Sequence, residues 1–167
     1  MNNKGFTLIE LLATVTLLAV LMIIAVPNII GVVNRNKNKS YIEDAKKLVS
    51  LAEYKIRADS SLKPNNGTYR CYTMSYLGGE EFGTAPNGGK YSLSRSYVRA
   101  NFSGGKVNYR VQLVEYKCKD PKNCIEADTT NKIYGIKEVA INDLYGENPT
   151  SHVVVDGAVA CTDTITY

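Results

Sequence analysis

The sequence is poor in the residues that acid–base enzymes use. Its 167 residues include no tryptophan and one histidine, His152, which we interpret as a strand residue rather than a catalytic base. Five prolines and thirteen glycines are too few for a Pro/Gly low-complexity polymer. Apolar residues make up 44% of the chain and charged residues 22%, as in a folded protein of about one domain. The composition therefore argues against both an acid–base enzyme and a disordered chain.

Charge is absent from a long stretch near the N-terminus. The 23 residues from Leu11 to Val33 contain no charged side chain. As a helix this stretch would reach about 34 Å, and the hydrocarbon core of a membrane is about 30 Å thick. It is longer than the apolar region of a secretory signal peptide and offers no convincing cleavage site of that kind. A buried helix of a soluble protein is the alternative, but such helices seldom stay apolar on every face. The stretch predicts a membrane anchor.

Glu10 is the one charged residue between Phe6 and Val33. A carboxylate held unpaired at bilayer depth costs about 2.5 kcal/mol or more. Its natural partner would be a positive group from another chain, or a new amino terminus created by processing. The alternative is that Glu10 simply lies at the level of the lipid headgroups. An ionisable residue at membrane depth usually marks a functional site, so we treat Glu10 as a candidate functional residue.

Residues 4–12, KGFTLIELL, resemble the prepilin signature of type IV pilins and type II secretion pseudopilins. In that family a prepilin peptidase removes a short basic leader that ends in glycine. The resemblance implies a leader that contains Lys4 and ends at Gly5, with cleavage before Phe6 and N-methylation of Phe6. It also implies that Glu10, the fifth mature residue, pairs with the Phe6 amino group of an adjacent subunit as the helices bundle into a filament. Breaking such a pair in apolar surroundings costs about 3–5 kcal/mol.

Pro27 falls where pilins commonly have a helix-kinking proline, so the resemblance implies that Pro27 is one of the assembly residues of this helix. A proline inside a helix removes a backbone donor and its ring clashes with the carbonyl four residues earlier. We therefore expect a kink or a locally melted turn within residues 23–31. Gly31 weakens the same region by about 1 kcal/mol relative to alanine. More Lys and Arg residues follow the anchor than precede it, which is contrary to the positive-inside tendency. We give the processing motif more weight, because the leader must be cytoplasmic to be cleaved.

The net charge of +4 is concentrated directly after the anchor. Residues 34–57 hold seven basic and three acidic residues, whereas the two kinds balance over residues 58–167. This basic segment could meet anionic lipid headgroups or an acidic neighbouring subunit, or it could be an ordinary solvated helix face. Phosphate recognition needs a basic surface. Residues 58–167 have no net charge, so DNA is a possible partner that the charge of this segment does not support.

Residues 41–56 have the apolar periodicity of a helix. Apolar residues recur every three or four positions and predict a stripe that packs on a sheet: Tyr41, Ala45, Leu48, Ala52 and Ile56. Glu43 with Lys47, and Glu53 with Arg57, are expected i,i+4 ion pairs. Turn-forming residues at 59–67 end the helix.

The rest of the chain predicts strands and turns. Strands are expected at 68–74, 95–102, 106–117, 132–141, 152–155 and 158–161, with a long glycine-rich loop at 76–90. Hairpin turns are expected at residues 103–105 and at Asp156-Gly157. An antiparallel sheet packed on the upper helix follows from this order.

Four cysteines, Cys71, Cys118, Cys124 and Cys161, allow three fully paired connectivities. In a domain exported beyond the membrane we interpret them as disulfides. Cys118 and Cys124 could close a small loop, leaving Cys71 to tie the first strand to Cys161 in the last. A zinc site is the alternative, but no Cys-x2-Cys spacing is present. Acidic and amide residues at 120–131 could bind Ca²⁺ but lack EF-hand spacing, so we predict neither metal nor cofactor.

Together these patterns predict an α+β, pilin-like protein. One long N-terminal helix, membrane-spanning in its lower half and amphipathic above, would pack on a C-terminal antiparallel β-sheet. The expected divisions are a leader at 1–5, a transmembrane assembly helix at 6–33, an amphipathic helix at 34–57 and an exported β-rich head at 58–167.

Two functions fit this organisation. The first is a non-enzymatic structural subunit of a type IV pilus or pseudopilus, which polymerises through its N-terminal helix after cleavage. Its partners would be copies of itself, other pilins, the prepilin peptidase, the pilus assembly machinery and the membrane. It would lie in the cytoplasmic membrane with its N-terminus inside and its head outside, and then in a surface filament. The second is a monomeric, membrane-tethered extracellular binding module, which would need neither Glu10 nor a cleavage motif.

Overall fold

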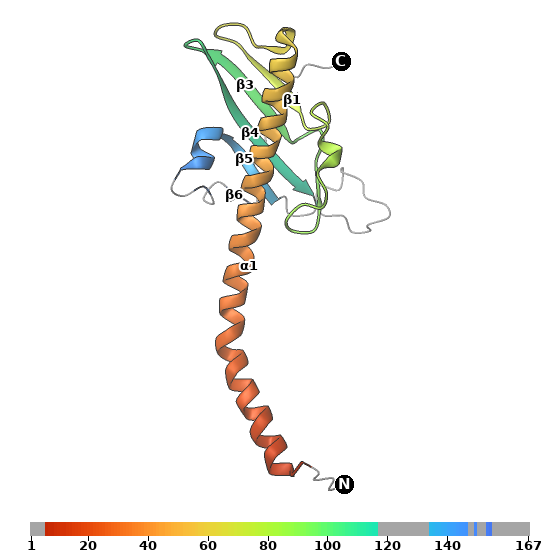
Figure 1. Ribbon diagram of the computed structural model, residues 1–167, viewed down its shortest axis with the longest axis vertical. Coiled ribbons are helices and arrows are strands. Elements are labelled where there is room, and N and C mark those ends of the chain that lie inside the picture. Colours follow the sequence, from red (N-terminus) through yellow and green to blue (C-terminus); the bar gives the residue numbers. More distant parts are fainter. Residues whose placement is uncertain (1–5, 117–133, 147–148, 150–152, 155–167) are drawn as a thin grey trace. The chain divides into compact units, whose positions relative to one another are not determined.

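The computed structural model describes residues 6–116, 134–146, 149 and 153–154. Its elements follow the chain in the order shown in Figure 1: α1 (Leu8–Ala58), η1 (Ser60–Leu62), β1 (Tyr69–Thr73), η2 (Gly79–Glu81), β2 (Lys90–Tyr91), β3 (Tyr97–Ser103), β4 (Lys106–Tyr116), β5 (Tyr134–Ala140), η3 (Ile141–Tyr145) and β6 (Val153–Val154). The chain divides into two compact units, Met1–Asn36 and Lys37–Tyr167, and α1 contributes to both. We call the second the sheet unit.

The helix α1 is 51 residues long and ends where the turn-forming residues begin. Asp59 follows its last residue, and the Asp59 Oδ1 atom accepts a hydrogen bond of 2.9 Å from the backbone N–H of Ser61. That contact caps the short helix η1, so the chain leaves α1 and turns at once. The predicted end of the helix is confirmed.

The apolar stripe of α1 forms one wall of the core in the sheet unit. All five predicted stripe residues are buried, as are Ile42 and Val49, which the prediction left out. These two flank Tyr41 and Leu48 and widen the buried face. The i,i+4 pair of Glu53 with Arg57 is confirmed at 2.6 Å.

The predicted pair of Glu43 with Lys47 is wrong. Glu43 Oε1 lies 3.1 Å from the Nζ atom of Lys46, one residue earlier than expected. The Lys47 ammonium instead lies 4.5 Å from the centre of the Phe82 ring. Tertiary packing of Lys47 on Phe82 therefore overrides the local helical pairing.

The sheet is antiparallel, with strand order β1-β3-β4-β5-β6 and β2 paired to β4. One of its faces packs against α1 through alternate apolar residues of the strands: Tyr72, Val98, Ala100, Val111, Leu113, Ile136 and Val139. The helix therefore covers one face of an antiparallel sheet, which confirms the predicted α+β, pilin-like arrangement (Figure 1).

The predicted strands up to residue 141 are confirmed as β1, β3, β4 and β5. The hairpin between β3 and β4 turns at Gly104 and Gly105, whose φ values of 61° and 76° suit glycine. Val153 and Val154 form β6, which pairs with β5. The predicted turn at Asp156-Gly157, the strand at 158–161 and His152 lie outside the described residues.

A buried carboxylate fastens the glycine-rich loop to the core. Glu115 on β4 accepts hydrogen bonds from the hydroxyl of Tyr41 on α1 and from the backbone N–H of Gly89, the latter at 2.8 Å. The backbone N–H of Asn87 donates to it at 3.3 Å, and the Asn87 side chain donates to the Tyr41 hydroxyl. Glu115 thus joins helix, sheet and loop at one point.

Candidate functional site

The N-terminal end of α1 is closed by a capping box of Thr7 and Glu10. The Glu10 Oε2 atom accepts hydrogen bonds of 2.8 Å from both the backbone N–H and the hydroxyl of Thr7. The backbone N–H of Glu10 donates in return to the Thr7 hydroxyl oxygen at 3.3 Å. This reciprocal arrangement satisfies N–H groups that a helix start leaves free. The one carboxylate of the apolar segment is therefore partnered within its own chain.

Sequence reasoning missed this cap, although a signal for it was present. A threonine followed three residues later by glutamate, in front of an apolar run, is the capping-box pattern. The same two residues belong to the processing motif, which drew the interpretation to the charge of Glu10 alone. Phe6 lies just before the cap and is 85% exposed, while Lys4 and Gly5 lie outside the described residues.

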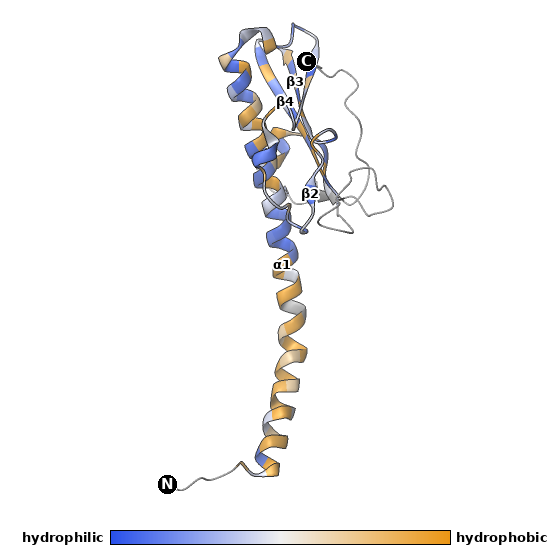
Figure 2. Ribbon diagram, turned by 90° about the vertical axis from the view of Figure 1, so that its right-hand side faces the viewer, coloured by the Kyte–Doolittle hydropathy of each residue, from blue (hydrophilic) through white to orange (hydrophobic). Residues whose placement is uncertain are grey.

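The first part of α1 exposes apolar side chains on every face. Each described side chain from Phe6 to Ile30 is exposed, and Figure 2 shows this part of the ribbon almost entirely in the hydrophobic colour. By length and composition α1 could cross a membrane, and none of its most apolar window is buried in the protein. A helix in the core of a soluble protein would be buried, so that alternative fails. The exposed apolar surface supports membrane association.

Of the two distortions expected around Pro27, a kink or a locally melted turn, the structure excludes the melted turn. The α-helical backbone continues without a break from Leu8 to Ala58, through residues 23–31. Prolines are tolerated in long apolar helices because neighbouring groups can take over the freed carbonyl. A Cβ on Gly31 would meet no atom within 4 Å, so no contact with the described part of the chain requires glycine there. The kink and the part of Pro27 in assembly stay predictions.

These features can be compared with known proteins. Residues 1–26 match the family model of the prokaryotic N-terminal methylation motif. The chain carries a prepilin-type signal. The match confirms the resemblance drawn from residues 4–12 and points to a structural rather than a catalytic protein that associates with the membrane and with other pilins. Comparisons with curated proteins and with solved structures gave no match.

Several of the basic residues at 34–57 in this pilin-like chain are held by partners within the protein. Three lysines on α1 lie over aromatic rings of the sheet unit, at 4.4–4.5 Å from the ring centres: Lys46 over Tyr145, Lys47 over Phe82 and Lys55 over Tyr76. Cation–π contacts of this kind help to hold the helix to the elements that it faces. Arg57 pairs with Glu53 as described above. More than half of the seven basic residues at 34–57 therefore have partners inside the sheet unit.

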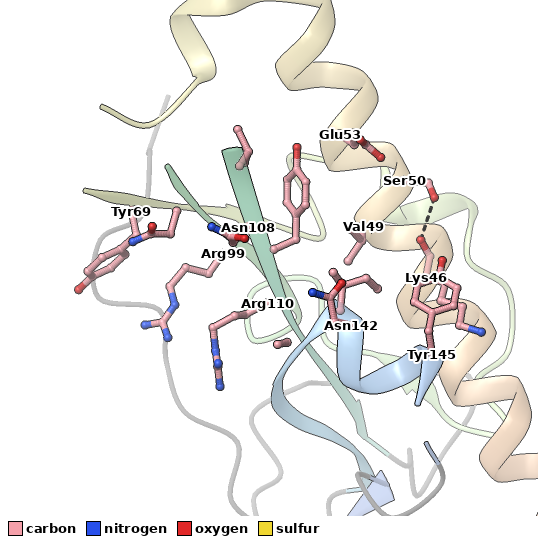
Figure 3. A pocket seen from close by; sticks show the side chains of 15 residues that line it. Lys46, Val49, Ser50, Glu53, Tyr69, Arg99, Asn108, Arg110, Asn142 and Tyr145 are labelled. Carbon is pink, nitrogen blue, oxygen red and sulfur yellow. Dashed lines mark hydrogen bonds between the residues drawn. The ribbon is translucent and has the colours of Figure 1, made fainter. Parts of the chain in front are cut away.

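A cavity of about 730 Å³ lies beside β4 in the sheet unit (Figure 3). The helix α1 lines one side with Lys46, Val49, Ser50 and Glu53, and η3 adds further residues that include Tyr145. Side chains of β1, β3 and β4 line the other side. The lining mixes polar, aromatic and aliphatic side chains, so the cavity suits a ligand that forms hydrogen bonds as well as apolar contacts.

Two arginines share one carboxylate at this cavity. Glu138 on β5 pairs with Arg99 and, at 2.7 Å, with the Nε atom of Arg110. The hydroxyl of Tyr97 also donates to Glu138 at 2.6 Å. Burial raises the pKa of the Tyr97 phenol, and its bond to Glu138 raises it further, so the phenol stays a donor. The cluster therefore carries one net positive charge.

Sequence reasoning did not find this cluster. Tyr97, Arg99 and Arg110 lie 28 to 41 residues before Glu138 in the chain, and only the pairing of three strands brings them to it. Among the described residues, no group of His, Cys, Asp and Glu is arranged to hold a metal ion. The acidic stretch at 120–131 lies outside them.

Cys71 is the one cysteine among the described residues. It is fully buried in β1, and it is not a free thiol. Cys118, Cys124 and Cys161 lie outside the described residues, so the connectivity stays a prediction.

Proposed function

We propose that this protein is a structural subunit of a type IV pilus or pseudopilus and that it polymerises through α1 after prepilin peptidase cleavage. One observation carries the proposal. A prepilin-type signal stands directly before a helix that is exposed and apolar on all faces, with a single carboxylate at its start. A helix of this kind can be covered by lipid before assembly and by other copies of itself afterwards.

Glu10 acts in this scheme by changing partners. In the isolated subunit its carboxylate accepts hydrogen bonds from Thr7. Cleavage at Gly5-Phe6 creates a positive amino terminus close to the same end of the helix. In the filament the carboxylate of one subunit pairs with the Phe6 amine of the next, so two charges that are costly in apolar surroundings neutralise each other.

The chain has four parts in this proposal. Residues 1–5 are a cytoplasmic leader, and residues 6–33 cross the membrane and later form the filament core. Residues 34–57 join that core to the exported part at 58–167. Copies of this chain, other pilins and the assembly machinery are the partners.

A membrane-tethered binding module is the second candidate. The cavity beside β4, with its two arginines, favours it because a purely structural subunit has no need of such a site. The tether needs no cleavage and no charge at position 10, so the two candidates predict different outcomes for the N-terminus.

We expect the mature protein to begin at N-methylated Phe6 and to contain the 162 residues that follow Gly5. The measurement is N-terminal mass spectrometry of protein extracted from membranes. A Gly5→Val variant should keep Met1, because a bulky residue replaces the glycine of the cleavage site, whereas a Gly31→Ala control should be processed normally. An intact Met1 in the unchanged protein, or a start after residue 25, would contradict the proposal.

We expect no free thiol in the exported protein. Because Cys71 is buried, labelling is done in denaturant, first without and then with reductant. No cysteine should react without reductant, and all four should react with it. If Cys118 pairs with Cys124, a Cys118→Ser variant should expose one new thiol at Cys124, located by peptide mass mapping. Labelling of all four cysteines without reductant would reject the disulfides.

A further inference from the structure

The strand β4 has an open edge at its N-terminal end. It pairs with β3 from Lys106 onward, but its pairing with β5 starts only at Arg110. On the β5 side, residues 106–109 therefore face no strand among the described residues. Residues 106–110 alternate between exposed and half-buried, whereas residues 111–115 are all buried. This short edge is thus open to solvent.

The cavity surrounds this edge and gives it two different walls. Alternate side chains of a strand point to opposite faces of its sheet. Val107 and Tyr109 face α1 and pack against the core, where Val49 and Ile141 line the same wall. Asn108 and Arg110 belong to the opposite face, where Arg99 also lines the cavity. The wall on the α1 side therefore combines the apolar Val49, Val107 and Ile141 with Lys46, Ser50 and Glu53, whose two charges balance, and the other wall is polar and positive.

The positive wall has unused hydrogen-bonding capacity. Arg110 donates to Glu138 through Nε and, at 3.4 Å, to the Glu138 backbone oxygen through Nη2. Its Nη1 group donates to no group among the described residues, and its side chain is 46% exposed. With Arg99 on the same carboxylate, the wall carries an excess positive charge that an anionic side chain would complement.

The edge is too short to serve as a general template for aggregation. Lys106 stands at its beginning, and a register shift between Val111 and Leu113 lies just beyond its end. Charged residues and bulges are the devices that limit pairing at sheet edges. Because α1 and η3 close the cavity on one side, the remaining space admits one added strand rather than a second sheet.

We propose that residues 106–109 of β4 bind an extended segment of a partner protein by strand addition, and that this segment alternates apolar and acidic residues. Its backbone pairs with the open edge. Its apolar side chains enter the wall formed by Val49, Val107 and Ile141, and its acidic side chains pair with Arg110 and Arg99. The interaction does not depend on filament formation, because it uses the sheet unit alone.

The test uses the full-length protein in detergent micelles and a fluorescent peptide that repeats valine and glutamate. Binding is followed by fluorescence anisotropy. We expect saturable binding that weakens about tenfold for Arg110→Glu, since the charge pair is replaced by repulsion. Arg110→Gln should lose less affinity for the peptide, and it provides a second test if Arg110→Glu misfolds. Circular dichroism checks the folding of both variants. Lys137→Glu is the matched control, because Lys137 is exposed on β5 and does not line the cavity.

A second peptide separates strand addition from simple charge attraction. Methylation of alternate backbone nitrogens on the pairing edge removes the N–H donors of that edge and obstructs close strand pairing but keeps all side chains, so this peptide should not bind. Equal binding of the methylated peptide, or equal affinity for Arg110→Glu and Lys137→Glu, would overturn the proposal. Absence of binding up to about 1 mM peptide would do the same. Binding of an acidic polysaccharide through Arg110, without peptide binding, would assign the cavity to a saccharide instead.

Discussion

Glu10→Ala is expected to abolish filament assembly and to leave membrane insertion and cleavage intact. Removal of a charge favours partition into the bilayer, so the monomer should still insert. In the filament, however, the Phe6 amine of the neighbouring subunit would be left unpaired in apolar surroundings, at about 3–5 kcal/mol for each subunit. The measurement compares membrane fractions with sheared surface filaments in cells that lack the unchanged protein.

The capping box makes a sharper version of this experiment possible. Glu10→Ala also removes the acceptor for Thr7, and loss of a cap costs about 0.5–2 kcal/mol of helix stability. Glu10→Gln keeps an acceptor for the cap but loses the charge, and it should also fail to assemble. Thr7→Ala weakens the cap and keeps the charge, so it should still form filaments. Normal filaments from Glu10→Ala would favour the membrane-tethered module instead.

The parts of the fold that could be predicted are those set by local patterns. The uncharged run from Leu11 to Val33 has the length of a membrane-spanning helix, and the stripe from Tyr41 to Ile56 has the period of an amphipathic helix. The turn glycines at 104 and 105 likewise fixed the hairpin between β3 and β4, because each has a positive φ. Each of these signals lies within a few residues of the structure that it determines.

Contacts between distant residues could not be read in this way. Lys47 packs on Phe82, which is 35 positions away, so the local rule for Glu43 and Lys47 failed. Glu138 gathers Arg99 and Arg110 only because β3, β4 and β5 are neighbours in one sheet. The capping box of Thr7 and Glu10 is a local contact and could have been predicted. The processing motif, however, already explained why these two residues are present.

Glu115 shows how a distant contact can decide stability. Its side chain is 1% exposed, and its described hydrogen bonds are donated by neutral groups on α1 and on the loop before β2. A carboxylate is seldom buried without such donors, because it loses its hydration. The loop backbone approaches β4 so closely that a Cβ on Gly89 would lie 2.7 Å from the Glu115 Oε1 atom and 2.3 Å from the Tyr116 carbonyl oxygen.

Glu115→Ala should therefore lower the free energy of unfolding of the sheet unit by roughly 3–5 kcal/mol, because it strands buried donors of Tyr41 and Gly89 and leaves a cavity. Urea unfolding of the full-length protein in micelles, followed by tyrosine circular dichroism, measures the change. Glu115→Gln should cost less, since its amide oxygen can still accept from Gly89. Glu81→Ala, at an exposed glutamate of η2, should change the free energy by less than about 0.5 kcal/mol. If Glu115→Ala were as mild as Glu81→Ala, the loop would not depend on this carboxylate, and the core packing of Tyr41 and Tyr91 would have to hold it in place.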